Sequence, residues 1–198
     1  MLSITLQNFV DTFQPDKTVQ PVDSVLINAY RGLLPDSLLE LWAKVGLGRY
    51  GDGLIQLINP DEYRALLCGW LMREEDEGDR LPIAISAFGR VFYYRRLSDD
   101  GDEDVAVLDP HYRNGNVLDW SLDAFFNDTL CDGEAIESLL ERGFFNQAVG
   151  RLGPLADGQI YFYTPALALG GVADVDHLDK GDAVVHLDLL LQMALGGE

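Results

Sequence analysis

The chain has 198 residues, and its 33 acidic and 14 basic residues leave a formal net charge of −19 at pH 7. A field of this sign repels DNA and RNA, so it argues against direct nucleic-acid binding and favours a basic partner. The sequence has no apolar run of 18 or more residues and predicts neither a membrane-spanning helix nor a membrane partner. Its start lacks a signal-peptide pattern, and Cys68 and Cys131 suit a reducing compartment, so we expect a cytoplasmic protein.

The first half of the chain predicts two helices and an antiparallel meander. Apolar residues at helical spacing predict a helix over 38–45. Asn59-Pro60 predicts the start of another helix, whose buried side chains are expected to be Tyr63, Leu66, Leu67, Trp70 and Leu71. Strands are predicted over 53–58, 82–88, 91–95 and 105–108. Asp109-Pro110 is expected to end the last strand, and Asn114-Gly115 predicts a turn.

The second half predicts three helices and one strand. Ser121 and Asp132 can cap two helices, the second of which is expected to end at Gly143, and Asp182 can cap a last helix over 183–195. The strand is predicted over 159–163. Together the elements predict an α+β fold, with an antiparallel or mixed sheet flanked by helices. Two subdomains, residues 1–112 and 113–198, are expected to pack as one compact unit.

The stretch 153–171, which reads GPLADGQIYFYTPALALGG, is the most informative part of the chain. An aromatic and β-branched run predicts the strand, which should end near a proline because proline cannot donate to a sheet ladder. The sequence of this stretch also resembles the C-terminal domain of type VI secretion immunity proteins, which are cytosolic antidotes to DNase toxins. The residues that carry this resemblance, with expected structural roles, are Gly153, Pro154, Leu155, Tyr161, Pro165, Gly170 and Gly171.

The first half resembles a second domain of the same proteins. The segments 34–42, 46–48 and 52–60 resemble a GAD-like domain, which commonly precedes the C-terminal domain in this family. Together the two resemblances span nearly the whole chain. They imply a cytosolic immunity protein that binds a cognate toxin, a DNase, in a stoichiometric complex and blocks its access to DNA.

The sequence contains no specific signal for catalysis, a cofactor or a metal ion. Its three histidines are expected in separate elements, and neither cysteine has a metal-ligand spacing to another ligand. Gly46-x-Gly48-x-x-Gly51 has the letters of a dinucleotide fingerprint, but it follows a helix and precedes a strand, which is the reverse of the required order. We therefore expect a protein that is not an enzyme and that needs no cofactor.

Three acidic segments, 74–79, 99–104 and 174–182, are expected to be surface loops and candidate contacts for a basic toxin. The leading candidates are Asp99, Asp100, Asp102, Glu103 and Asp104. The other candidates are Glu74, Glu75, Asp76, Glu77, Asp174, Asp176 and Asp179. Two other functions remain open: an acidic binding module for another toxin class or for effector handling, and a carboxylate-based hydrolase.

Overall fold

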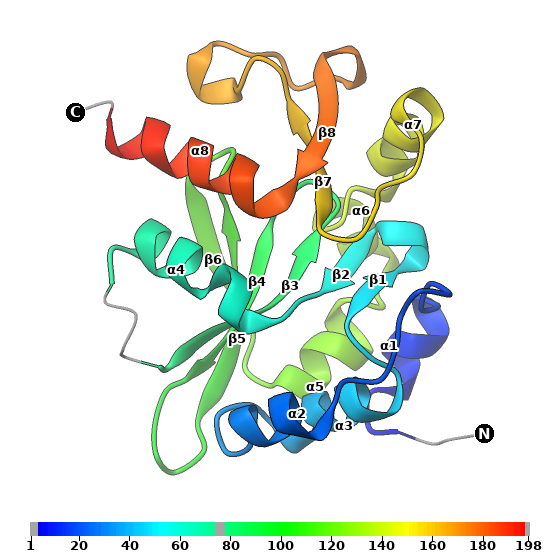
Figure 1. Cartoon of the computed structure of the whole chain (residues 1–198), viewed down its shortest axis with the longest axis vertical. Helices are drawn as coiled ribbons and strands as arrows, with labels where there is room; N and C mark the ends of the chain where they lie inside the picture. Colours follow the sequence, from blue (N-terminus) through cyan, green and yellow to red (C-terminus); the bar gives the residue numbers. More distant parts are fainter. Residues whose placement is uncertain (1–3, 74–77, 197–198) are drawn as a thin grey trace.

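A computed structural model describes residues 4–73 and 78–196 of the chain (Figure 1). Its main feature is a six-stranded antiparallel sheet in which each strand pairs with the next along the chain. The strands are β1 (Gly48–Tyr50), β2 (Ile55–Leu57), β3 (Arg80–Ser86), β4 (Val91–Arg96), β5 (Glu103–Asp109) and β6 (Asn114–Asp119). The predicted meander is confirmed, and β1 and β6 extend it on its two sides.

The described part of the first half contains the α-helices α1 (Gln7–Thr12), α2 (Ser24–Tyr30), α3 (Asp36–Lys44) and α4 (Pro60–Leu71). The predicted start of α4 is confirmed, because the Asn59 side chain accepts a hydrogen bond from the backbone N–H of Asp61 at 3.2 Å. The predicted apolar face of α3 is buried as well, with Leu41 and Trp42 fully inaccessible to solvent.

The second half adds helices and a separate pair of strands. The helices are α5 (Leu122–Ala124), which continues into a π-helical turn (Phe125–Thr129), then α6 (Gly133–Ser138), α7 (Arg142–Leu152) and α8 (Ala183–Leu195). The antiparallel strands β7 (Gln159–Tyr163) and β8 (Leu178–Asp182) form a two-stranded sheet. The predicted caps Ser121, Asp132 and Asp182 are confirmed, because each side chain accepts hydrogen bonds from the first turn of its helix.

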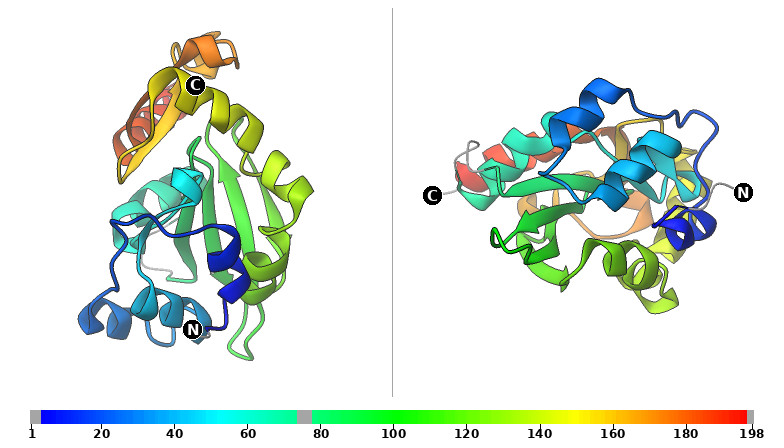
Figure 2. Two further views of the ribbon diagram at one scale, coloured as in Figure 1. Left: turned by 90° about the vertical axis from the view of Figure 1, so that its right-hand side faces the viewer. Right: turned by 90° about the horizontal axis from the view of Figure 1, so that it is seen from below.

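The central strands are buried on both faces of the sheet. In β4, Phe92 and Tyr94 belong to one apolar core, whereas Val91 and Tyr93 belong to the other. This alternation follows from the two-residue period of a strand. α4 and α8 cover one face and the helices α1 and α5 lie on the other side, so the sheet lies between two helical layers (Figure 2). The α+β class predicted from the sequence is confirmed.

Two predicted local features are wrong. Asn114-Gly115 is not a turn but the start of β6, since Gly115 pairs with Leu108 and a Cβ atom there would lie 2.8 Å from the Val107 carbonyl oxygen. Close approach between strands therefore explains this glycine. Gly143 does not end a helix either: it lies inside α7, and the break from α6 occurs at Glu141, whose φ is 55°.

The six-stranded sheet and the β7–β8 sheet meet along a seam that β2 and β7 line. The buried Gln56 amide donates from Nε2 to the Gln159 carbonyl at 2.7 Å and accepts from the Gly158 N–H at 3.0 Å. Arg49 extends the seam with an ion pair to Asp157 at 2.9 Å. The halves therefore pack as one unit. The expected boundary between residues 112 and 113 falls in the turn between the paired strands β5 and β6 and stays a prediction.

Within the described ranges, none of the helices has the length and apolar composition needed to cross a membrane.

Substitutions of two glycines, one in the turn after β7 and one in α7, should have opposite effects on stability. A Cβ atom on Gly171 would lie 1.9 Å from the Pro165 carbonyl oxygen, so Gly171→Ala should lower the free energy of unfolding by about 2–3 kcal/mol. Gly150 lies in α7 with open space around its Cα, so Gly150→Ala should raise that free energy by about 0.5–1 kcal/mol. Urea denaturation of both variants measures the difference, and equal stabilities would contradict it.

Candidate partner-binding surface

The β4–β5 hairpin projects from one end of the sheet and carries the leading acidic candidates (Figure 1). The Ser98 hydroxyl accepts hydrogen bonds from the backbone N–H groups of Asp100 and Asp102 and donates to the Asp102 carboxylate at 2.9 Å. The loop therefore has its own hydrogen-bonded structure. Asp99, Asp100 and Asp102 are exposed on it, and Asp99 forms an ion pair with Arg96 at 3.0 Å.

Glu103 and Asp104 differ from the solvated loop residues that the sequence predicted, because both belong to β5. Asp104 is fully buried and receives two hydrogen bonds from its cross-strand neighbour Arg95, one of them 2.6 Å long. The half-buried Glu103 carboxylate accepts from the Leu122 N–H at 2.9 Å and from the Tyr94 hydroxyl at 3.0 Å. Asp104 is therefore a structural charge that no partner can reach, and Glu103 presents only part of its carboxylate.

The other acidic candidates lie elsewhere. Glu74, Glu75, Asp76 and Glu77 fall outside the described residues. Residues 174–182 are not a loop, as the sequence predicted, but a 3-10 turn followed by β8, because this segment pairs with β7. Asp174 caps that turn, whereas Asp176 and Asp179 are exposed. This segment lies at the opposite end of the molecule from the β4–β5 hairpin, so one compact partner surface cannot contact both (Figure 1).

The residues that carried the family resemblance build the scaffold. The Tyr161 hydroxyl donates to the Gly153 carbonyl at 2.6 Å and Lys180 Nζ donates to the Pro154 carbonyl at 2.8 Å, which ties β7 and β8 to the end of α7. The remaining motif residues are Leu155, which is buried, Pro165, which follows β7, Gly170, whose φ is 85°, and Gly171, which has no room for a side chain.

Three open hollows surround the β4–β5 hairpin. Their volumes are about 480, 430 and 280 Å³. Five residues each line two of the three hollows: Leu33, Arg96, Leu97, Gly101 and Glu103. Trp120 lines the second hollow and is 72% exposed, although tryptophan is usually highly buried. No pattern in the sequence singled out Trp120. Its one local signal is that it directly precedes the Ser121 cap, because β6, which ends at Asp119, was not predicted.

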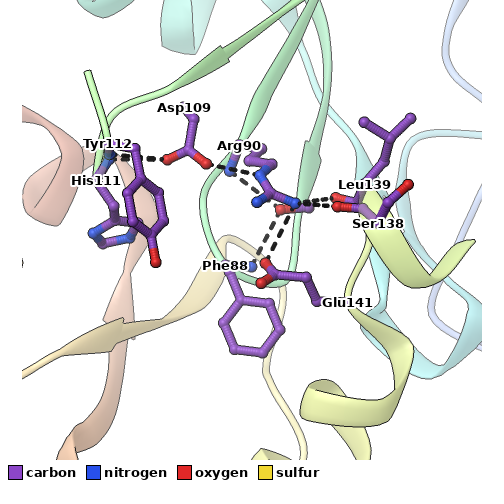
Figure 3. A network of polar contacts seen from close by, with 9 residues as sticks. Phe88, Arg90, Asp109, His111, Tyr112, Ser138, Leu139 and Glu141 are labelled. Atoms are coloured by element: carbon purple, nitrogen blue, oxygen red, sulfur yellow. Dashed lines mark hydrogen bonds and ion pairs between the residues drawn. The ribbon is translucent and has the colours of Figure 1, made fainter. Parts of the chain in front are cut away.

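A second polar cluster joins the hairpin β3–β4 to the second half of the chain (Figure 3). Arg90 donates to Asp109 at 2.8 Å, to the Ser138 and Leu139 carbonyls at 2.9 and 2.8 Å, and lies 3.4 Å from the Glu141 carboxylate. Burial raises the pKa of Glu141. Each charged group of the cluster has a partner of opposite sign, so the cluster is suited to hold segments together.

Two histidines that were expected in separate elements lie close together. The ring centroids of His111 and His186 are 5.9 Å apart, and the His186 ring stacks on Phe162 at 3.8 Å. Burial, followed by the neighbouring His111, lowers the pKa of His186 to about 4. Among residues 4–73 and 78–196, no group of three or more potential metal ligands occurs, and the pair has no third ligand.

The structure is that of an α+β protein with an exposed acidic hairpin at one end of its sheet. The model of the GAD-like domain matches residues 4–100, and that of the C-terminal domain of the T6SS immunity protein Tdi1 matches residues 120–194. The chain therefore belongs to the type VI secretion system (T6SS) immunity proteins of the Tdi1 type, with an N-terminal GAD-like domain. Both resemblances seen in the sequence are confirmed.

A solved structure has the same fold. The crystal structure of Atu4351 from Agrobacterium tumefaciens superposes with a TM-score of 0.75, covering 94% of this chain and 88% of that one, at 20% identity. At this identity the likeness concerns the fold alone. Comparison with curated proteins gave no significant match.

The histidine pair predicts a dependence of stability on pH. Because the pKa of His186 is lower in the folded state than its ordinary value near 6.5, the unfolded chain binds more protons between these pH values. Stability should therefore fall as pH decreases from 6.5 towards 4. Since His186 is only half-buried, solvent screening reduces this contribution to about 1 kcal/mol. His186→Phe should retain the stack on Phe162, and its melting temperature should fall less between pH 7 and pH 5 than that of the unaltered protein. Equal falls would show that His186 is not the cause.

Proposed function

We propose that this immunity protein binds a cognate type VI toxin inside the cell, that the toxin is a DNase, and that a stoichiometric complex neutralises it without catalysis. The match of residues 120–194 to the Tdi1 immunity domain is the observation that carries the proposal. The net charge of −19 supports the DNase assignment. A nuclease needs a basic groove to hold the phosphate backbone, and an acidic protein is complementary to such a groove.

The exposed β4–β5 hairpin is the proposed contact surface. Asp100, Asp102 and Glu103 have no ion-pair partner in the part of the chain that the structure describes, so their charge is available to a basic surface. Repulsion among these carboxylates is relieved when a cation approaches, which favours binding. The hydrogen bonds of Ser98 hold the loop, so little order has to be gained when the complex forms.

The direct test uses the purified chain and the protein encoded by the neighbouring gene as the candidate toxin. We expect a stable one-to-one complex in gel filtration and protection of linear DNA when the two proteins are mixed in equal amounts. Complex formation with a toxin that does not cut DNA would overturn the DNase assignment while leaving the immunity function. Absence of any complex would overturn this toxin as the partner.

The hairpin charges predict a kinetic effect on that complex. Replacing Asp99, Asp100 and Asp102 with Asn should lower the association rate about tenfold or more at low salt, because electrostatic steering is lost, and should change the dissociation rate much less. The control variant Asp52→Asn/Asp128→Asn/Glu134→Gln changes the net charge equally at exposed positions outside the hairpin.

Surface plasmon resonance at 0.05 and 0.5 M salt measures both rates. In the unaltered protein, salt should slow association far more than it hastens dissociation, and the hairpin variant should lose most of this salt dependence. Equal effects of the two triple variants would show that net charge, and not the hairpin, steers the encounter. In that case the exposed carboxylates of residues 174–182 become the next candidates.

A further inference from the structure

We propose that the hollow between Trp120 and the β4–β5 hairpin is a binding site for an arginine side chain of the toxin. Its lining consists of Leu97, Gly101, Asp102, Glu103 and Trp120. The identity of the partner rests on the proposed function, whereas the preference of the hollow for arginine can be measured without the toxin.

The lining combines the two surfaces that an arginine side chain needs. Leu97 is 44% and Trp120 is 72% exposed, so both offer apolar area to an aliphatic stem. An exposed indole face also attracts a cation, and tryptophan does so more strongly than tyrosine or phenylalanine. Asp102 and Glu103 supply carboxylates at the same hollow. The volume of about 430 Å³ is ample for one long side chain.

Asp102 and Glu103 have no ion-pair partner within the described chain, whereas the nearby Asp99 and Asp104 do. Arg95 is paired with the buried Asp104, and Arg96 is paired with Asp99. Asp102 and Glu103 instead accept hydrogen bonds from neutral hydroxyl or backbone N–H groups. A carboxylate has about four lone-pair sites, so both can accept further bonds from a guanidinium. The local charge therefore favours a cationic occupant.

The Glu103 side chain and the residues on either side of Trp120 are held in place by the fold. Glu103 is fixed between Tyr94 and the first turn of α5. Trp120 lies between two anchored residues: Asp119 accepts from the Ser121 N–H at 3.3 Å and from the Thr129 hydroxyl at 2.7 Å. A site of this kind loses little conformational entropy on binding. Arginine is preferred over lysine because its planar guanidinium can stack on the indole while it donates to a carboxylate.

The first experiment compares an acetylated hexa-arginine peptide with an acetylated hexa-lysine peptide at the same ionic strength. The peptides carry equal charge, so general attraction to the acidic surface cancels in the comparison. We expect the arginine peptide to bind about two- to fivefold more tightly by calorimetry. It should also shift the indole N–H resonance of Trp120, which the Trp120→Phe variant identifies. Equal binding of the two peptides would overturn the assignment.

Variants then locate the preference. Trp120→Leu retains an apolar side chain but removes the indole face, so it should abolish the arginine preference while both peptides still bind. Asp102→Asn should weaken both peptides. The control is Tyr112→Ala, which removes another exposed aromatic ring outside this hollow and should leave the preference unchanged. An unchanged preference in Trp120→Leu would overturn the proposal, and circular dichroism establishes that each variant is folded.

The toxin assay separates this inference from the proposed function. If the chain protects DNA from the candidate toxin, Trp120→Leu should raise the dissociation constant of that complex about two- to fivefold. Full affinity of Trp120→Leu for a toxin that the chain neutralises would overturn the use of this hollow while leaving the immunity function. Failure of the chain to protect DNA, with the arginine preference intact, would instead count against the DNase partner.

Discussion

The buried amide of Gln56 joins the six-stranded sheet to the β7–β8 sheet. Strands β2 and β7 do not pair as neighbours in one sheet, so backbone groups of β7 would be left without partners at the seam. The Gln56 side chain supplies one donor and one acceptor to them and thereby replaces a strand-to-strand ladder. Such groups cost about 1–3 kcal/mol each when buried without partners. A third hydrogen bond, from the Tyr161 N–H to the Ala87 carbonyl at 2.8 Å, satisfies another backbone group of β7 at this seam.

Apolar cores and paired charges fill the interior of this strongly acidic chain. The two cores take up both faces of the sheet, and charged groups that enter the interior do so in pairs, as Arg90 with Asp109 and Arg95 with Asp104. Removing one partner of such a pair is costly because the other charge remains buried. Many of the remaining carboxylates lie at the surface, where water screens their repulsion. In the β4–β5 hairpin, Asp104 is buried and paired, whereas Asp99, Asp100 and Asp102 are exposed to solvent.

The local sequence predicted an element correctly where the tertiary contacts favour the same structure as the local pattern. The helix that Asn59 caps belongs to this group because its apolar periodicity matches the face it buries. The central strands belong to it because their apolar runs match burial on both faces of the sheet. β6 was missed because Asn114-Gly115 is a local turn signal that strand pairing overrides. Asp104 was predicted in a surface loop because it ends an acidic run. Its burial depends on the cross-strand pairing with Arg95, which the local sequence does not indicate. The contact between His111 and His186 joins distant segments and could not be read from spacing.

The proposed recognition residues lie at the junction between the two matched domains. The GAD-like match ends at residue 100 and the Tdi1-type match begins at residue 120, so part of the hairpin lies between them and Trp120 begins the second. The contacts that hold the hairpin loop, such as those of Ser98, are local and do not involve Gln56 or Tyr161. Substitutions in the loop can therefore alter the charge and shape offered to a toxin without disturbing the seam. Because the fold is fixed elsewhere, the proposed contact surface can change at this end of the sheet at little cost in stability.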